Sequence, residues 1–339
     1  MKATGLVTAF AAALAFVSCS KPAPAPQADQ TVSFSVLSAE DAQSMAKVWQ
    51  PVFDDMHKAT GLTIKPFYAT NYASLVEAMR FNQTQAGWFS ALPALEATRR
   101  ADAQVIGRIL TNGAEGSYRS VLIVKEGSKL TLDDVLKCGK KLNFGIGDPK
   151  STSGTLAPMA YIFVPKGIEP AQCFKTVKSA DHKANFYAVA SGLLDVATNN
   201  TVGLMFYARE NPEMARKVKV IWQSPELPES SILVRKDLDP AIKEKIRQFF
   251  LSYGQAPGAE GDRQRQVLKL LTYTGFAPAD NSYLDPVRQM EAATNLGEAR
   301  HSGDSARIAA AQKAFDALQA ELAAKNPANP PPPGPIQAR

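Results

Sequence analysis

Near its middle the chain reads Lys141-Leu142-Asn143-Phe144-Gly145-Ile146-Gly147-Asp148-Pro149-Lys150-Ser151-Thr152-Ser153-Gly154-Thr155-Leu156-Ala157-Pro158. Residues 141–146 have the apolar character of a strand, and the residues after 158 continue as a helix, so a hydroxyl-rich turn joins a strand to a helix. At such a turn the hydroxyls of Ser151, Thr152 and Ser153 can converge with free backbone N–H groups, where the helix dipole favours negative charge. The stretch therefore predicts a cradle for a small oxyanion. A plain helix cap is the alternative, because Ser and Thr commonly serve as caps.

The segment before this turn predicts the fold class. Residues 31–36 alternate as a strand does, residues 45–56 place apolar side chains at helical spacing, and residues 62–67 form the next strand. This β-α-β order predicts a parallel sheet that binds ligands at the carboxyl ends of its strands. The roughly 300 residues of folded chain are many for one core, so two α/β lobes are expected.

Both ends of the chain have the composition of segments outside the folded body. Residues 1–18 combine a positive charge, a short apolar core and a small residue before Cys19, which predicts a secretory signal peptide of the lipoprotein type, with Cys19 as the lipidated N-terminus. The alternative is a plain soluble periplasmic protein that is cleaved nearby. The Pro/Ala composition of residues 19–30 predicts a linker, and that of residues 326–339 a disordered Pro-rich tail.

Charge and motif content exclude several classes of function. The net charge is +6, from 38 basic and 32 acidic residues, but the basic residues are scattered among acids, so no nucleic-acid partner is expected. His57, His182 and His301 lack metal-ligand spacing, so neither a metal nor a cofactor is expected. The chain contains no Gly-x-Ser-x-Gly elbow and no Cys/His pair in a catalytic context, which argues against an enzyme.

The run Gly147–Gly154 resembles the signature of the phosphate, phosphite and phosphonate substrate-binding proteins of ABC importers, the PhnD family. Residues 79–82 with Trp88, and the run 194–201, resemble the family as well, so the resemblance covers roughly 32–276. It implies a two-lobed periplasmic binding protein, type II-like, with a hinge between two α/β lobes and a C-terminal helical extension. The expected divisions are residues 31–117 with 225–300 for lobe 1, residues 118–224 for lobe 2 and residues 301–325 for the C-terminal helix.

The resemblance also implies which residues bind the ligand. Tyr72, Tyr118 and His182 would complete the shell around the Ser151–Ser153 turn, and the protein would be a monomer that delivers its ligand to a membrane permease. Export permits a disulfide, so we expect Cys138 and Cys173 to bridge around the cradle, the alternative being two separate buried thiols.

Two positions of the sequence indicate which ligand the protein prefers. Family members that take up 2-aminoethylphosphonate are expected to place acidic side chains where this chain has Val202 and Ser230. An ammonium group without a counter-charge is strongly disfavoured in a closed cleft, which predicts phosphite, methylphosphonate or another alkylphosphonate without an amine. Glu226 or Glu229 could substitute for the missing acids. The alternatives are therefore a 2-aminoethylphosphonate- or phosphate-binding protein, or a sensory or enzymatic module on the same scaffold.

Overall fold

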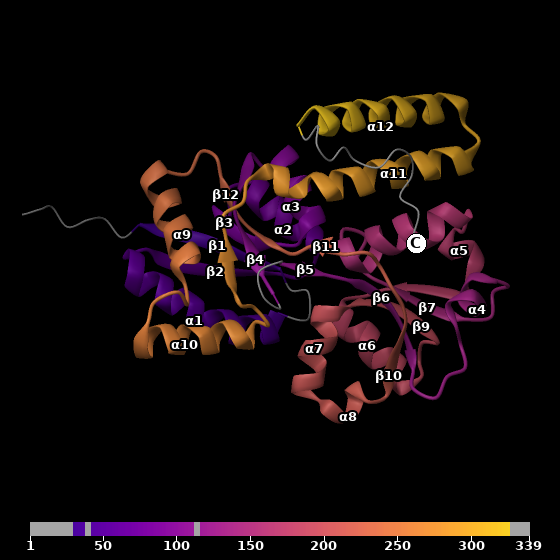
Figure 1. Ribbon diagram of the computed structural model, residues 1–339, viewed down its shortest axis with the longest axis horizontal. Helices are drawn as coiled ribbons and strands as arrows, with labels where there is room; N and C mark the ends of the chain where they lie inside the picture. The colour runs from indigo at the N-terminus through magenta and orange to yellow at the C-terminus, as the bar shows by residue number, and fades with distance from the viewer. Residues whose placement is uncertain (1–29, 38–41, 112–115, 326–339) are drawn as a thin grey trace, which may run out of the picture.

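The computed structural model describes residues 30–37, 42–111 and 116–325. In it the chain forms two α/β lobes that lie side by side, which confirms the predicted two-lobed architecture (Figure 1). The predicted signal peptide, Cys19, nearly all of the linker and the Pro-rich tail lie outside the described residues.

The first lobe is built on a mixed six-stranded sheet of order β13-β4-β12-β3-β1-β2. β1 pairs in parallel with β2 and β3, as the β-α-β order predicted, whereas β12 runs antiparallel to β3 and β4. β13 adds an antiparallel edge to β4. The strands are β1 Thr31–Leu37, β2 Thr63–Ala69, β3 Ala86–Phe89, β4 Ala103–Leu110, β12 Ser231–Arg235 and β13 Gly275–Ala277.

The second lobe is built on a five-stranded sheet of order β10-β6-β9-β7-β8. β7 pairs in parallel with β8 and β9, while β6 is antiparallel to both β9 and β10. The strands are β6 Ser120–Lys125, β7 Asn143–Ile146, β8 Thr176–Ser179, β9 Val196–Asn200 and β10 Val218–Gln223. All of them lie within residues 120–223; the exact lobe boundaries stay a prediction.

A short antiparallel ribbon connects the two sheets. Its strands are β5 Ser117–Tyr118, which precedes β6, and β11 Leu227–Pro228, which follows β10 and precedes β12. Both passages of the chain between the sheets therefore run side by side. Such a two-stranded connection is a suitable hinge, because few backbone dihedrals need to change for the lobes to rotate.

The helices follow the apolar periodicity of the sequence. α1 (Ala42–Thr60) and α9 (Pro240–Ser252) bury the side chains that recur at helical spacing, and α2 (Tyr72–Arg80) begins with a capping box between Asn71 and Ser74. α10 (Gly258–Leu270) lies beside α1 (Figure 1). Further helices of the two lobes are α3 Ala91–Arg100, α4 Leu132–Leu136, α5 Pro170–Cys173, α6 His182–Ser191, α7 Thr201–Glu210 and α8 Pro212–Ala215, with short 3-10 turns at η3 Val164–Lys166 and η4 Asn281–Leu284.

A buried polar contact joins α1 to the segment around α9 and α10. The carboxylate of Asp55 accepts a hydrogen bond from the Tyr253 hydroxyl at 2.7 Å and pairs with the Arg263 guanidinium at 2.6 Å. Because Asp55 is buried, these two partners replace the water that its carboxylate would otherwise bind.

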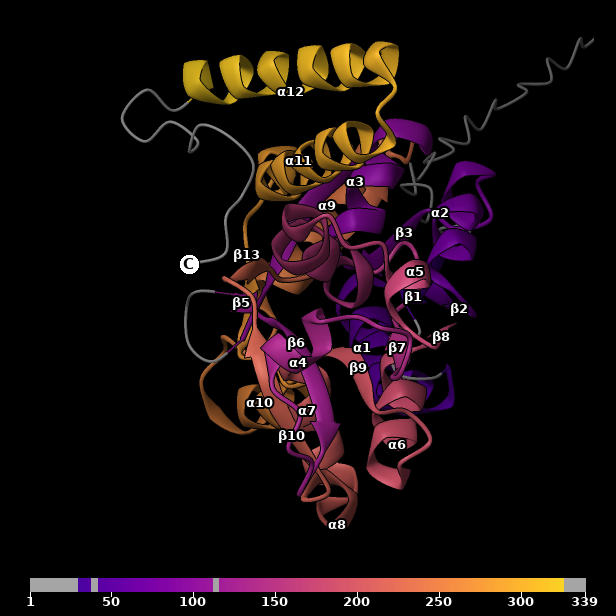
Figure 2. The same ribbon diagram turned by 90° about the vertical axis from the view of Figure 1, so that its right-hand side faces the viewer.

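The C-terminal extension is a pair of helices rather than one. α11 (Asp285–Ser302) packs against α3 of the first lobe and against η2 (Met159–Phe163) of the second, and α12 (Ser305–Lys325) lies on the outer side of α11 (Figure 2). An Arg288–Glu321 ion pair of 2.8 Å joins α11 to α12. The sequence analysis predicted the second helix and missed the first, because small and polar residues such as Ala293 and Thr294 occupy part of its buried face.

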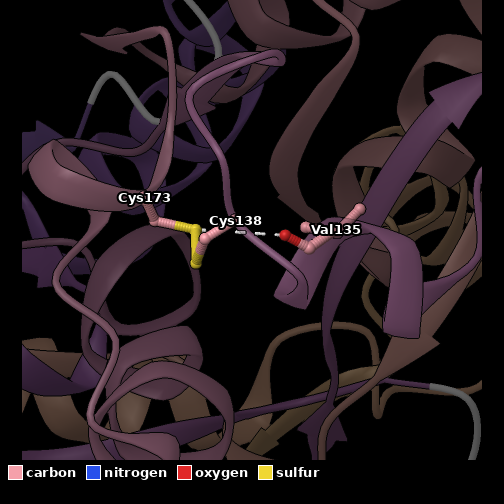
Figure 3. The surroundings of a disulfide bond; sticks show 3 residues. All are labelled: Val135, Cys138 and Cys173. Carbon is pink, nitrogen blue, oxygen red and sulfur yellow. Dashed lines mark hydrogen bonds between the residues drawn. A yellow bond between two sulfur atoms is a disulfide. The ribbon is translucent and has the colours of Figure 1, made fainter.

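Cys138 and Cys173 form a disulfide bond (Figure 3). The cysteines are separated by 35 residues in the sequence. The loop that they close contains β7 and the hydroxyl-rich turn. This cross-link therefore restrains the part of the second lobe on which the predicted cradle is built.

Candidate functional site

A small cavity lies between the lobes, next to the hinge ribbon. Its volume is about 50 Å³, and since one water needs roughly 10–15 Å³ on such a measure, it accommodates a ligand of only a few heavy atoms. The polar residues that line it are Tyr72, Ser90, Tyr118, Ser151, Ser153, His182, Asn200, Glu229 and Ser230. The apolar side chains are those of Leu37, Met45, Trp88, Val202, Phe206 and Leu271, together with the ring of Tyr273.

Strand ends explain why these residues meet. Leu37 ends β1, Ser90 follows β3 and Asn200 ends β9, while Ser151 follows β7 closely in sequence. The carboxyl ends of parallel strands in each lobe face the space between the lobes, as expected for ligand sites in α/β sheets.

The predicted cradle begins with an unusual helical turn. Ser151 is the N-cap of η1 (Thr152–Leu156), and its hydroxyl accepts a hydrogen bond from the Gly154 N–H at 2.9 Å. η1 is wound with i→i+5 hydrogen bonds, such as that from Leu156 N to Ser151 O at 3.0 Å, whereas an ordinary helix was predicted. A Cβ atom on Gly154 would lie 2.8 Å from the Cα atom of Gly147, so close backbone approach requires a glycine there.

His182 closes the cradle from the first turn of α6. Its Nε2 atom lies 3.4 Å from the hydroxyl oxygens of both Ser151 and Ser153. Burial lowers the pKa of His182 to about 4, so the imidazole is neutral at pH 7 and carries one N–H donor.

Thr152 has a different position from its two neighbours. Its hydroxyl accepts a hydrogen bond from the Leu92 N–H of α3 at 2.8 Å, and it is not among the residues that line the cavity. Leu92 belongs to the first lobe and Thr152 to the second. The Thr152 hydroxyl therefore joins the two lobes, and the Thr152 side chain also hydrogen-bonds Tyr118, which lines the cavity.

The two predicted tyrosines lie on the first-lobe side and at the hinge. Tyr72 begins α2, and its N–H donates to the Asp148 carboxylate of the second lobe at 3.4 Å. Tyr118 is in the hinge strand β5, where burial, with a smaller contribution from the charge of Glu229, raises the pKa of its hydroxyl. Tyr118 is therefore a neutral hydrogen-bond donor at physiological pH.

The two specificity positions also line the cavity. Val202 lies in the first turn of α7, and Ser230 lies between β11 and β12. Of the two glutamates considered as substitutes for the missing acids, Glu226 is 54% exposed and pairs with Arg119 at 3.0 Å on the surface. Glu229 instead lines the cavity and is buried. Of the described lining residues, Glu229 is the only carboxylate, and none is Lys or Arg.

Several contacts hold the lobes together around the cavity. Lys150 of the second lobe pairs with Glu96 of α3 at 3.0 Å. Arg209 of α7 donates to the carbonyl oxygens of Lys269 and Leu270, at the end of α10, at 2.8 and 2.6 Å. The lobes thus meet as in a closed binding protein.

The geometry agrees with what comparison with known proteins shows. A family model described as "ABC transporter, phosphonate, periplasmic substrate-binding protein" matches residues 34–284. The chain belongs to this family. It is 38% identical, over 79% of its length and 78% of the relative's, to the phosphonates-binding periplasmic protein of Escherichia coli. The protein is thus a periplasmic substrate-binding component of a phosphonate ABC transporter, and its family consists of transport proteins rather than enzymes.

Solved structures give the same fold. A binding protein component of an ABC phosphonate transporter from Pseudomonas aeruginosa superposes with a TM-score of 0.83 at 33% identity, covering 88% of this chain and 99% of the other. PhnD1 of Prochlorococcus marinus, solved in complex with methylphosphonate, superposes with a TM-score of 0.68 at 19% identity, covering 77% and 97%. The second likeness is one of fold alone.

No helix within residues 30–37, 42–111 and 116–325 has the length and apolar character needed to cross a membrane. In the same part of the chain no group of three or more His, Cys, Asp or Glu side chains is arranged to hold a metal ion.

The sequence analysis named most of the polar residues that line the cavity and missed others. Trp88, which was named only for its resemblance to the family, is buried in the first-lobe core and also lines the cavity. Ser90 and Asn200 were not singled out. Both residues could have been predicted from their position at the carboxyl ends of β3 and β9, because ligands of α/β sheets bind at the carboxyl ends of the strands.

Proposed function

We propose that the protein captures a small phosphorus oxyanion without an amine, such as phosphite, methylphosphonate or a short alkylphosphonate, and delivers it to its membrane permease. The observation that carries the proposal is the cavity of about 50 Å³, which is lined both by neutral donors and by apolar side chains. A tetrahedral oxyanion suits the donors, and a hydrogen or alkyl substituent on phosphorus suits the apolar side chains.

The donors are of three chemical kinds. The hydroxyls of Ser151 and Ser153, the phenols of Tyr72 and Tyr118 and the imidazole of His182 all belong to lining residues. A hydrogen bond from a neutral donor to an anion contributes roughly 1.5–3 kcal/mol. Several of them acting together support micromolar or tighter binding after the costs of association and ordering.

The apolar residues that line the cavity support a ligand without an amine. Val202 stands with Leu37, Met45 and Phe206 among the lining residues, and Ser230 takes the second position at which an acid was expected. An ammonium group that loses its water beside such side chains is disfavoured unless a carboxylate compensates its charge. Glu229 is the residue that could do so.

Contacts from both lobes to the ligand explain how the protein could deliver it to the permease. Tyr72 belongs to the first lobe, Tyr118 to the hinge, and Ser153 and His182 to the second lobe. A ligand that bonds to all of them stabilises the closed state over the open one, and this difference in shape is what a permease can recognise.

Isothermal titration calorimetry with phosphite, methylphosphonate, phosphate and 2-aminoethylphosphonate tests the specificity. We expect the non-aminated phosphite and phosphonate ligands to bind at least tenfold more tightly than 2-aminoethylphosphonate. Tightest binding of the aminated ligand would overturn the specificity proposal. Phosphorus NMR of the released ligand is expected to show it unchanged, since the protein binds without turnover.

We further propose that Cys19 is lipidated and anchors the protein to a membrane. The proposal rests on the signal-like composition of residues 1–18 and on the small residue before Cys19. Labelling with a fatty acid analogue in the bacterial host is expected to mark the wild type and not Cys19→Ala. Equal labelling of both proteins would refute the anchor.

A further inference from the structure

Glu229 is a buried carboxyl group at the hinge with one oxygen unused. Its backbone N–H donates to the Gly116 carbonyl at 3.1 Å, which fixes the main chain across the ribbon. Its Oε1 atom accepts from both the N–H and the hydroxyl of Ser230, at 2.8 and 3.0 Å. Its Oε2 atom is buried and has no hydrogen-bond partner among the described residues. The side chain is 5% exposed and lines the cavity.

The surroundings of Glu229 offer phenols rather than cations. Tyr118 of β5 and Tyr283 of η4 both feel its charge, which raises the pKa of each hydroxyl further after the main effect of burial. Arg108 of β4 stacks on the Tyr283 ring, 5.8 Å from its centroid, and does not line the cavity. His182, the one imidazole among the lining residues, is neutral. Burial raises the pKa of Glu229, and the Ser230 hydrogen bonds offset part of that rise.

An oxyanion in this cavity is therefore incompatible with an ionised Glu229. The ligand and the carboxylate would be like charges in a small volume with little water, where their repulsion is weakly screened. The helix start at Ser151 contributes only partial positive charge. Either the ligand brings its own cation or Glu229 must lose its charge.

We propose that Glu229 is protonated when the cavity holds a phosphorus oxyanion without an amine, and that Oε2 then donates a hydrogen bond to the ligand. The inference rests on the proposed function and adds a residue that recognises the ligand by its charge. Protonation provides a donor where the geometry leaves an unpaired oxygen. The same oxygen repels an oxyanion when the proton is absent.

A proton balance follows. The closing site takes one proton from solvent onto the Glu229 carboxylate, so that the total charge of the buried cluster remains that of the ligand alone. Above the pKa that Glu229 has in the open protein, affinity decreases as pH increases, by up to tenfold per pH unit. At lower pH the carboxyl is already protonated, and its contribution to the pH dependence vanishes.

The test compares wild type with Glu229→Gln, using methylphosphonate as the probe. The amide keeps the shape and offers an N–H donor in place of the O–H, so we expect its affinity to lie within about threefold of the wild type at low pH. Calorimetry in buffers of different ionisation enthalpy is expected to show close to one more proton taken up by the wild type than by the variant. Titration of the ligand affects both proteins equally, and the difference between them isolates Glu229.

Glu226→Gln is the matched control, because Glu226 is a surface glutamate three residues away. It should behave as the wild type. Equal proton uptake by wild type and Glu229→Gln would overturn the inference and assign the proton to another group, such as His182. A loss of 2-aminoethylphosphonate binding in Glu229→Gln, with no proton uptake by the wild type, would also overturn it and identify an ionised partner for an amine.

Two features keep the test decisive. At a pH away from the pKa of the ligand, the wild-type proton count needs no variant, so it remains informative even if Glu229→Gln melts early. Failure of the wild type to bind any phosphorus oxyanion would refute the proposed function itself. Binding with no uptake of a proton would refute the inference alone.

Discussion

Replacement of Ser153 by Ala is the sharpest test of the cradle, because the structure separates its side chain from its backbone. The Ser153 carbonyl accepts a hydrogen bond from the Ser120 hydroxyl at 2.6 Å, so the main chain stays in place when the side chain is shortened. The Ser153 side chain makes no cap; its hydroxyl lies 3.4 Å from His182 Nε2 and also hydrogen-bonds the Tyr118 side chain. Ser153→Ala is therefore expected to weaken ligand binding by more than it lowers the stability of the ligand-free protein.

The magnitude follows from the kind of bond that is lost. A hydrogen bond to a charged ligand contributes roughly 1.5–3 kcal/mol, which corresponds to a loss of about ten- to 150-fold in affinity. Variants of the two residues before Ser153 serve as controls, because they should change stability and affinity differently. Ser151→Ala removes a cap as well and should lower the unfolding free energy by about 1 kcal/mol. Thr152→Ala leaves the Leu92 N–H without its acceptor in the closed state, so it should weaken binding through closure.

Calorimetry with methylphosphonate and thermal unfolding of the ligand-free proteins are the two assays. The double variant Thr152→Ala with Ser153→Ala should lose at least tenfold in affinity. Unchanged affinity in Ser153→Ala would refute the cradle and leave the turn as a simple cap. A fall in the stability of ligand-free Ser153→Ala as large as its loss of binding energy would show that the hydroxyl acts on folding instead.

Three further predictions concern the scaffold. Replacing Cys138 and Cys173 by Ser should lower the unfolding free energy by about 3–4 kcal/mol, as expected for a 35-residue separation; an unchanged denaturation midpoint would contradict this. Lys150→Met removes the ion pair with Glu96 that joins the lobes. Because the Lys150 side chain is 44% exposed, the loss of ligand-binding free energy should stay below about 1 kcal/mol and disappear at high salt. A loss of affinity above tenfold would show that the ion pair contributes more than a surface pair does. Asp55→Ala leaves a buried tyrosine hydroxyl unpaired and should cost about 1–3 kcal/mol of stability in denaturant unfolding, with unchanged ligand affinity; no change in stability would refute the role of this contact.

Local patterns predicted β1, β2 and α1 correctly because the causes of these elements are local. The apolar side chains that recur at helical spacing in residues 45–56 are buried in α1, as expected. The predicted ligand shell is also brought together, apart from Thr152. Its residues follow strands, and sheet pairing carries strand ends to one edge.

Other features depend on contacts between segments that are distant in the sequence. Thr152 was grouped with Ser151 and Ser153, but its hydroxyl meets the Leu92 N–H, 60 residues away. The i→i+5 winding of η1 goes with the close approach of Gly147 and Gly154, which sequence periodicity does not encode. Such features require the packed structure.

The sequence by itself determined the two-lobed α/β fold and the hydroxyl-rich turn, because periodicity, caps and turn residues act over a few positions. Only the tertiary structure decided between Glu226 and Glu229. The two glutamates flank the two-residue strand β11, and its pairing with β5 leaves the first at the surface with Arg119 and turns the second into the cavity. Which side a residue takes in so short a strand is set by its pairing partner, and the charge of the binding site depends on that choice.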